Sequence, residues 1–167
     1  MRHSNWMGTV CNFAKKLDLK YGIMSSTRIK WLVGREFSSQ KRSVPRKKVL
    51  VVEDNEDARV LMEAILKTEG LDVIDAADGE EGYERAVEES PDLIITDISM
   101  PRVTGLQLIK RLRGLPRFKG VPILAVTAYG IDKAIEAMQA GANRALARPI
   151  ENHLLRAFVS DLLNSHK

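Results

Sequence analysis

The chain of 167 residues is poor in cysteine and has no long apolar segment. Its single cysteine, Cys11, excludes an intramolecular disulfide and fits a reducing compartment, so we expect a cytoplasmic protein. No apolar run approaches the roughly 18–20 residues that a helix needs to cross a bilayer. The N-terminus also lacks the compact apolar core of a secretory signal. The sequence therefore predicts neither a transmembrane segment nor an exported protein.

Acidic residues are scarce in the first 48 positions. This stretch contains 12 Lys and Arg but only Asp18 and Glu36, a net charge of +10. Residues 49–167 contain 14 basic and 20 acidic residues, a net charge of −6. The net charge of +4 for the whole chain therefore describes neither part. A basic surface that could attract nucleic acid is available through the N-terminal arm alone.

The hydrophobic pattern divides the chain into residues 1–46 and 47–167. Before the division apolar residues are scattered, apart from a weakly amphipathic stretch from Val10 to Tyr21, and residues 38–48 (SSQKRSVPRKK) are typical of a linker. We expect residues 1–46 to be a disordered basic extension, because charge of one sign and few apolar residues oppose packing. The alternatives are an arm that binds an acidic partner, nucleic acid or a membrane surface, an organelle presequence, and a later start of translation.

After Lys48 short apolar runs alternate with amphipathic segments. The runs are almost continuously apolar, as is typical of strands buried on both faces of a parallel sheet: Val49–Val52, Leu71–Ala76, Leu93–Thr96, Ile123–Val126 and Ala145–Ala147. Helical periodicity follows each run, over residues 59–69, from Asp78 onward, and over 106–112, 133–140 and 154–163. Five such units predict an α/β fold with an open, doubly wound parallel sheet.

Polar residues follow four of the five predicted strands. They are Glu53-Asp54 after the first, Asp97 after the third, Thr127 after the fourth and Arg148-Pro149 after the fifth. Because ligands bind at the carboxyl ends of the strands in such sheets, we expect these side chains to share one site. Clustered carboxylates need a cation between them, and hard oxygen donors suit Mg²⁺. A hydroxyl and a fixed positive charge alongside would suit a phosphoryl group.

A strand-end aspartate has a second interpretation as a helix N-cap. Asp54 stands just before a predicted helix and would suit that role. Capping does not account for carboxylates, a hydroxyl and a cation at four strand ends. A metal-dependent hydrolase fits poorly as well, because the three histidines, His3, His153 and His166, all lie outside these motifs and leave no evident general base for water.

Four segments resemble the receiver domain of two-component response regulators. They are VLVVEDNEDARVLMEAIL, PDLIITDISMPRVTGLQLIKRLR, VPILAVTAYG and AGANRALARPI. The spacing D-x-x-M-P-x-x-x-G, which begins at Asp97, is highly specific, and the resemblance covers about residues 47–166. It implies a (βα)5, flavodoxin-like fold with strand order 2-1-3-4-5.

The resemblance implies that Asp97 is the phosphoacceptor. It would take the phosphoryl group from a phosphohistidine of a sensor histidine kinase or a histidine phosphotransfer protein. The implied ligands of Mg²⁺ are Asp54, Asp97, the backbone carbonyl of Ser99 and, through a water, Glu53. Such a domain catalyses only its own phosphorylation and dephosphorylation, so we do not expect a conventional enzyme.

The resemblance also implies roles for residues around the phosphoacceptor. Thr127 would donate a hydrogen bond to a phosphoryl oxygen. Met100, Pro101 and Gly105 would shape the neighbouring loop, with the glycine serving either a backbone conformation that a Cβ opposes or close packing. Pro149 stands where the family often has a cis peptide.

Two positions depart from the family's pattern. Arg148 stands where the family usually has Lys; we expect it to contact the phosphoryl group in an altered way, or to pair with Asp97 at rest. The alternative is that Arg148 simply tethers the acidic cluster. Ala145 replaces the Tyr or Phe whose ring usually reports phosphorylation, and Tyr129 is an alternative source of a ring. These changes put the usual activation relay in doubt, but not the acidic pocket.

Three functions remain open from the sequence. The leading one is a single-domain response regulator that signals to a downstream protein, because no effector domain is expected after the last predicted helix. The second is a phosphorylation-independent receiver that acts as a protein-docking module, which Arg148 and Ala145 favour. The third is a nucleic-acid-binding regulator that uses the basic arm.

Overall fold

The computed structural model describes residues 45–128 and 130–165. Five parallel strands form one sheet in the order β2-β1-β3-β4-β5, which confirms the predicted topology. The strands are β1 (Lys48–Val52), β2 (Asp72–Ala76), β3 (Leu93–Asp97), β4 (Ile123–Thr127) and β5 (Arg144–Ala147). All of the predicted strands are present, and each boundary lies within one residue of the prediction.

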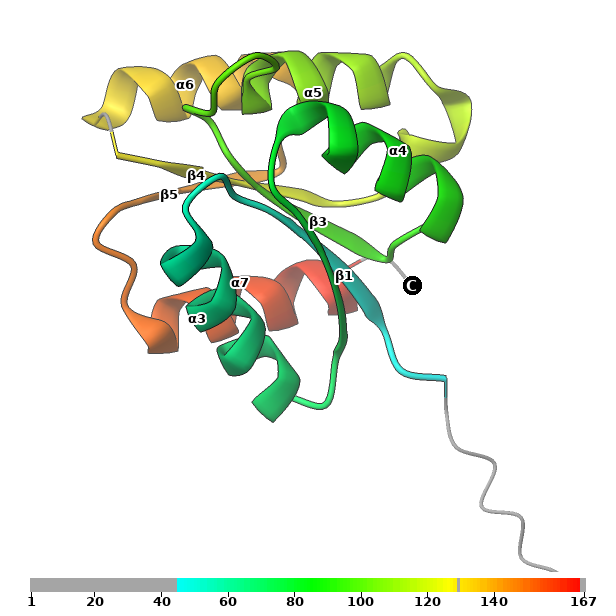
Figure 1. Cartoon of the computed structure of the whole chain (residues 1–167), viewed down its shortest axis with the longest axis vertical. Coiled ribbons are helices and arrows are strands. Elements are labelled where there is room, and N and C mark those ends of the chain that lie inside the picture. The colour runs from blue at the N-terminus through cyan, green and yellow to red at the C-terminus, as the bar shows by residue number, and fades with distance from the viewer. Residues whose placement is uncertain (1–44, 129, 166–167) are drawn as a thin grey trace, which may run out of the picture. The chain divides into compact units, whose positions relative to one another are not determined.

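Helices cover both faces of the sheet (Figure 1). Helices α3 (Glu56–Thr68) and α7 (Asn152–Asn164) lie on one face, and α4 (Gly79–Glu89), α5 (Gly105–Arg113) and α6 (Gly130–Ala140) lie on the other. A short 3₁₀ helix, η1 (Pro116–Phe118), precedes β4. Within the described part of the chain, no helix is both long enough and apolar enough to cross a membrane. The predicted extension, residues 1–46, lies almost wholly outside the described residues.

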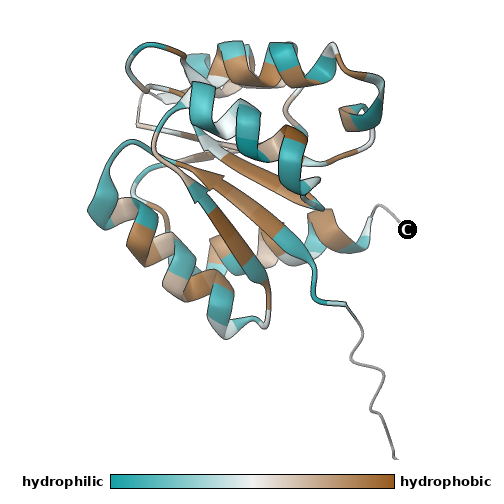
Figure 2. Ribbon diagram, turned by 45° about the vertical axis from the view of Figure 1, so that its right-hand side comes forward, coloured by the Kyte–Doolittle hydropathy of each residue, from teal (hydrophilic) through white to brown (hydrophobic). Residues whose placement is uncertain are grey.

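The sheet separates two hydrophobic cores. Successive side chains of a strand point to opposite faces, so Leu50 packs toward α4 and α5 while its neighbours Val49 and Val51 pack toward α3 and α7. The central strands are apolar along their length (Figure 2). Every residue of β3 and β4 is buried, whereas the edge strands β2 and β5 are partly exposed. This burial explains why the central strands have nearly continuous apolar sequences.

Helix α3 begins earlier than its apolar periodicity predicts, at Glu56 instead of Arg59. Its N-cap is Asn55, whose side chain accepts a hydrogen bond from the Ala58 amide at 2.9 Å. The alternative interpretation of Asp54 as the N-cap is therefore wrong. Because Asn55 takes the capping role, the Asp54 carboxylate is left for the strand-end site.

Candidate functional site

Three carboxylates meet at the carboxyl ends of two neighbouring strands. Glu53 and Asp54 directly follow β1, and Asp97 ends β3, which pairs with β1 in parallel register. One carboxylate oxygen from each of the three lies within 4.8 Å of the others. Glu53 is 2% exposed and Asp97 is 7% exposed, whereas Asp54 is exposed. The cluster therefore opens to solvent on the side of Asp54.

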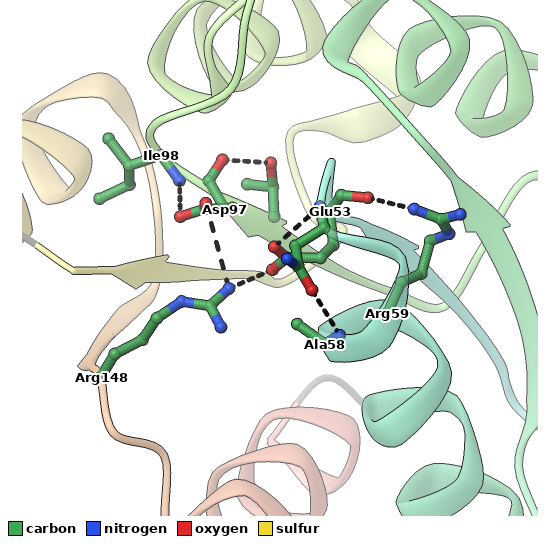
Figure 3. Close-up of polar contacts among 8 residues, drawn as sticks. Glu53, Ala58, Arg59, Asp97, Ile98 and Arg148 are labelled. Atoms are coloured by element: carbon green, nitrogen blue, oxygen red, sulfur yellow. Dashed lines mark hydrogen bonds and ion pairs between the residues drawn. The ribbon is translucent and has the colours of Figure 1, made fainter.

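The Asp97 carboxylate is oriented by its own strand end. Its Oδ1 accepts a hydrogen bond from the Ile98 amide at 2.7 Å, and its backbone carbonyl accepts one from the Thr96 hydroxyl at 2.9 Å. The other oxygen, Oδ2, lies 4.0 Å from the Arg148 guanidinium. Figure 3 shows Asp97 held between Ile98 and Arg148. One oxygen is thus fixed by the backbone while the other faces the cationic side of the site.

Arg148 follows β5 and reaches across to β1. Its amide donates to the Thr127 carbonyl at 2.8 Å, and its peptide bond to Pro149 is cis. The guanidinium Nη2 forms a short ion pair with Glu53 Oε2 (Figure 3). The predicted pairing with Asp97 is therefore secondary, because the main partner of Arg148 is Glu53.

Glu53 has an unusual electrostatic environment. Burial raises the pKa of its carboxyl above the usual value, the Arg148 charge opposes that rise, and the nearby Asp97 charge adds to it. The net direction is upward because desolvation of a carboxylate disfavours its charged form. Keeping Glu53 charged in this buried position therefore costs free energy of desolvation, and a nearby cation reduces that cost.

Arg59 is a residue of this region that sequence reasoning missed. From α3 it donates to the Glu53 carbonyl at 2.7 Å (Figure 3). It also forms an ion pair of 3.3 Å with Asp75 of β2. It therefore fixes the end of β1, from which Glu53 and Asp54 project. No sequence signal could identify it, since its acceptor in the site is a backbone carbonyl.

Gly105 allows α5 to start against the end of β3. A Cβ at this position would lie 1.9 Å from the Asp97 carbonyl oxygen, and the Gly105 amide donates to the Ile98 carbonyl at 3.1 Å. The glycine thus serves close packing, one of the two roles left open. In the same loop Met100 is 4% exposed and belongs to the core, whereas Ser99 and Pro101 are exposed.

Thr127 and Ala145 lie on neighbouring strands. Thr127 is the last residue of β4 and is fully buried, opposite Ala147 of β5. Ala145 lies opposite Ala125 in the same ladder, and it is half-buried against the core that faces α5 and α6. No ring lies at position 145. Tyr129, the predicted alternative, lies outside the described residues.

Residues 49–160 match the family model of the response regulator receiver domain. The chain belongs to this family. Receiver domains are signalling domains of two-component systems, which agrees with the fold and with the resemblance noted from the strand-end motifs.

Relatives and solved structures show the same receiver domain. The chain is 36% identical over 119 residues to the alkaline phosphatase synthesis transcriptional regulatory protein PhoP of Bacillus subtilis, a match that covers 70% of this chain and 48% of PhoP. The polar-differentiation response regulator DivK of Brucella anthropi is 34% identical over 105 residues, with 62% of this chain and 85% of DivK covered. The chain thus spans about half the length of PhoP but most of DivK.

One solved structure bears on the acidic pocket. The receiver domain of a sensor histidine kinase from Pseudomonas aeruginosa PAO1 superimposes with a TM-score of 0.67 at 29% identity, covering 71% of this chain and 98% of that one. That structure has a magnesium ion coordinated in its active site cleft. The receiver family binds Mg²⁺ in its active site, and an acidic cluster of Glu53, Asp54 and Asp97 is present in this chain.

A groove of this receiver lies beside the acidic cluster. It has a volume of about 500 Å³ and runs between α3 and α7, with Leu61 and Met62 on one wall and Pro149 and Leu155 on the other. Arg148 also lines the groove. A single side chain therefore belongs both to the acidic cluster and to the apolar groove.

Proposed function

We propose that the chain accepts a phosphoryl group on Asp97 from a histidine kinase or a histidine phosphotransfer protein, in a Mg²⁺-dependent reaction. The output would be a changed interaction with a downstream protein in the cytoplasm. One observation carries the proposal: the carboxylates of Glu53, Asp54 and Asp97 meet within 4.8 Å at adjacent strand ends, beside Thr127 and Arg148. Carboxylates, a hydroxyl and a cation in this arrangement suit phosphoryl transfer to a carboxylate.

The donor set supports a magnesium site. Asp54, Asp97 and the Ser99 carbonyl would bind the ion directly, and Glu53 would bind it through a water. All of these donors are oxygens, which hard divalent cations prefer, and the exposed Asp54 leaves a path to solvent. When bound, Mg²⁺ would neutralise the charge that gathers on the carboxylates and on the phosphoryl oxygens.

The chain's own residues would position the reacting groups. Asp97 Oδ1 is held by the Ile98 amide, so Oδ2 would attack phosphorus while the P–N bond to the donor imidazole breaks and its electron pair returns to the ring nitrogen. The Thr127 hydroxyl would donate to one phosphoryl oxygen. The Arg148 guanidinium, already 4.0 Å from Oδ2, would offset the charge on another.

Intact-mass spectrometry tests this proposal. The full chain would be incubated with Mg²⁺ and acetyl phosphate, and Asp97→Asn would serve as the matched variant. We expect the wild type to gain the mass of one phosphoryl group and Asp97→Asn to gain none. No gain on the wild type, or an equal gain on Asp97→Asn, would reject the proposal.

The second candidate is a receiver that docks its partner without phosphorylation. Ala145 favours it, because a methyl group at this position cannot swing inward as a ring would. It requires that a binding partner holds wild type and Asp97→Asn equally well in a pull-down assay. Weaker binding to Asp97→Asn would count against it.

A third candidate uses the basic arm, residues 1–46, to bind nucleic acid. The net charge of +10 over residues 1–48 favours it, since contacts with phosphates are mainly electrostatic. It requires salt-sensitive binding to a DNA or RNA duplex in a fluorescence anisotropy assay. Deletion of residues 1–46 should abolish that binding, and binding that persists would exclude the arm.

A further inference from the structure

Arg148 contacts two of the three carboxylates of the acidic cluster. Its Nη2 forms an ion pair with Glu53 Oε2 and lies 4.0 Å from Asp97 Oδ2 (Figure 3). The remaining oxygens of these carboxylates have backbone donors: the Asn55 amide lies 3.4 Å from Glu53 Oε1, and the Ile98 amide lies 2.7 Å from Asp97 Oδ1. The oxygens that face Arg148, Glu53 Oε2 and Asp97 Oδ2, are therefore the ones that the backbone amides do not occupy.

The guanidinium can leave this position without crossing the core. The Arg148 side chain is 27% exposed, whereas that of Glu53 is 2% exposed. Arg148 also lines the groove between α3 and α7, together with Pro149 and Met62. A guanidinium that moves away from Glu53 would therefore change the wall of that groove.

We propose that Arg148 and the divalent cation compete for the Glu53 and Asp97 carboxylates, so that metal binding releases Arg148 from Glu53 and remodels the α3–α7 groove. The released guanidinium would return to the site when a phosphoryl group on Asp97 supplies new negative charge. This inference rests on the proposed magnesium site. In this proposal Arg148 is an internal cation that Mg²⁺ can displace. Its movement would transmit metal binding from the acidic cluster to the α3–α7 groove, without an aromatic side chain at position 145.

Metal affinity tests the competition. Isothermal titration of the full chain with Mg²⁺ compares the wild type with Arg148→Gln, which is neutral and too short to reach Glu53. The matched control is Arg144→Gln, which removes the same charge from the start of β5, where Arg144 is exposed. We expect Arg148→Gln to bind Mg²⁺ about tenfold more tightly than wild type, from loss of one charged hydrogen bond. Arg144→Gln should stay within about twofold, because screening weakens charge effects beyond about 8–10 Å.

Arg148→Lys keeps the positive charge, and it tests the competition between Arg148 and Mg²⁺ if Arg148→Gln fails to fold. An ammonium has a shorter reach and no planar fork, so it should hold Glu53 less well. We expect a Mg²⁺ affinity between those of wild type and Arg148→Gln. An affinity equal to that of wild type in both variants would overturn the competition while leaving the proposed function intact. Absence of Mg²⁺ binding in wild type and in every variant would overturn the magnesium site itself.

Methyl NMR tests the release into the groove. With methionine methyl groups labelled with ¹³C, Met62 reports on the groove and Met138 reports on α6, across the sheet. Saturating Mg²⁺ should shift the Met62 signal in the wild type and leave Met138 nearly unchanged. The Met62 shift should shrink in Arg148→Gln, because no guanidinium leaves the cluster. An unshifted Met62 signal in the wild type, or an equal shift in Arg148→Gln, would overturn the link to the groove.

Discussion

Two partly buried arginines hold opposite ends of the sheet in different ways. Arg113, at the end of α5, donates to the carbonyls of Gly141 and Val121 at 2.8 Å each, to the Asn143 side chain at 2.9 Å, and to the Phe118 carbonyl. Its acceptors surround the amino ends of β4 and β5. Arg148 lies at the carboxyl end of β5, where its partners are the carboxylates of Glu53 and Asp97.

The difference lies in the partners. The acceptors of Arg113 are neutral and mostly backbone carbonyls, so they carry no net charge for which another cation would compete. Burial lowers the pKa of the Arg113 guanidinium, which nonetheless stays charged at any physiological pH. The carboxylates around Arg148 can exchange one cation for another. Arg113 is therefore a structural arginine with fixed partners, and Arg148 is a counter-ion that another cation can replace.

Substitution of Arg113 should have the largest effect on stability. Arg113→Met removes the side-chain donor from the carbonyls of Gly141 and Val121, so we expect the free energy of unfolding to fall by about 3 kcal/mol. Urea denaturation followed by circular dichroism measures this loss, which should be the same with and without Mg²⁺. The control Arg117→Met, on exposed η1, should change stability by less than about 1 kcal/mol. A loss that Mg²⁺ restores would contradict the distinction between the two arginines.

A smaller effect is expected at Asp78, another fixed charge. Asp78 caps α4 by accepting from the Glu80 and Glu81 amides at 2.8 and 3.0 Å, and it pairs with Arg102. These amides, and then the Arg102 charge, hold the pKa of the Asp78 carboxyl below its usual value of 3.8. We expect Asp78→Ala to lower the free energy of unfolding by about 1 kcal/mol at pH 7.

The pH dependence of Asp78 has a definite sign. Because its pKa is lower in the folded state, the stabilisation is complete above the unfolded-state value near 3.8 and is lost as the pH falls through the lower folded-state value. Urea denaturation of wild type and Asp78→Ala between pH 7 and pH 2 should therefore show the difference shrinking at the acid end. A difference that stays constant to pH 2 would assign the effect to packing alone.

The smallest effect, of opposite sign, is expected at Glu53. Its pKa is raised in the folded state, so its charge opposes folding above the folded-state pKa, and this cost disappears below the unfolded-state value near 4.5. Without Mg²⁺ at pH 7, Glu53→Gln should raise the free energy of unfolding by up to about 1 kcal/mol. The control Glu63→Gln, at a half-buried residue of α3 that pairs with the exposed Lys67, should be neutral within about 0.5 kcal/mol. Destabilisation by Glu53→Gln would mean that the ion pair with Arg148 outweighs the burial of the charge.

The sequence predicted the sheet because the central strands are buried on both faces. Continuous apolar runs such as Ile123–Val126 identify such strands, and the polar residues that follow them identify the site. Helix starts were less accessible. Helix α6 begins at Gly130, three residues before the predicted Lys133, because its first turn is exposed and the apolar Ile131 there does not face the core.

Contacts of the long charged side chains could not be predicted. Whether Arg148 pairs with Asp97 or Glu53 depends on a side-chain rotamer, and the preference for Glu53 appears only in the structure. The hydrogen bonds of Arg113 to the Gly141 carbonyl and of Arg59 to the Glu53 carbonyl could not be predicted from the sequence either. Their acceptors are backbone atoms, which every residue carries. The sequence therefore predicted which residues lie at the candidate site, and the structure shows how their side chains pair.

The central claim is that the carboxylate of Asp97 carries the phosphoryl group. Reductive trapping tests it most directly: the chain is treated with acetyl phosphate and Mg²⁺, then with borohydride, which reduces an acyl phosphate to an alcohol. Tandem mass spectrometry of the peptides should then find homoserine at position 97 in the wild type and nowhere in the untreated protein. Homoserine at another carboxylate, such as Asp54, or none after the full treatment, would contradict the account.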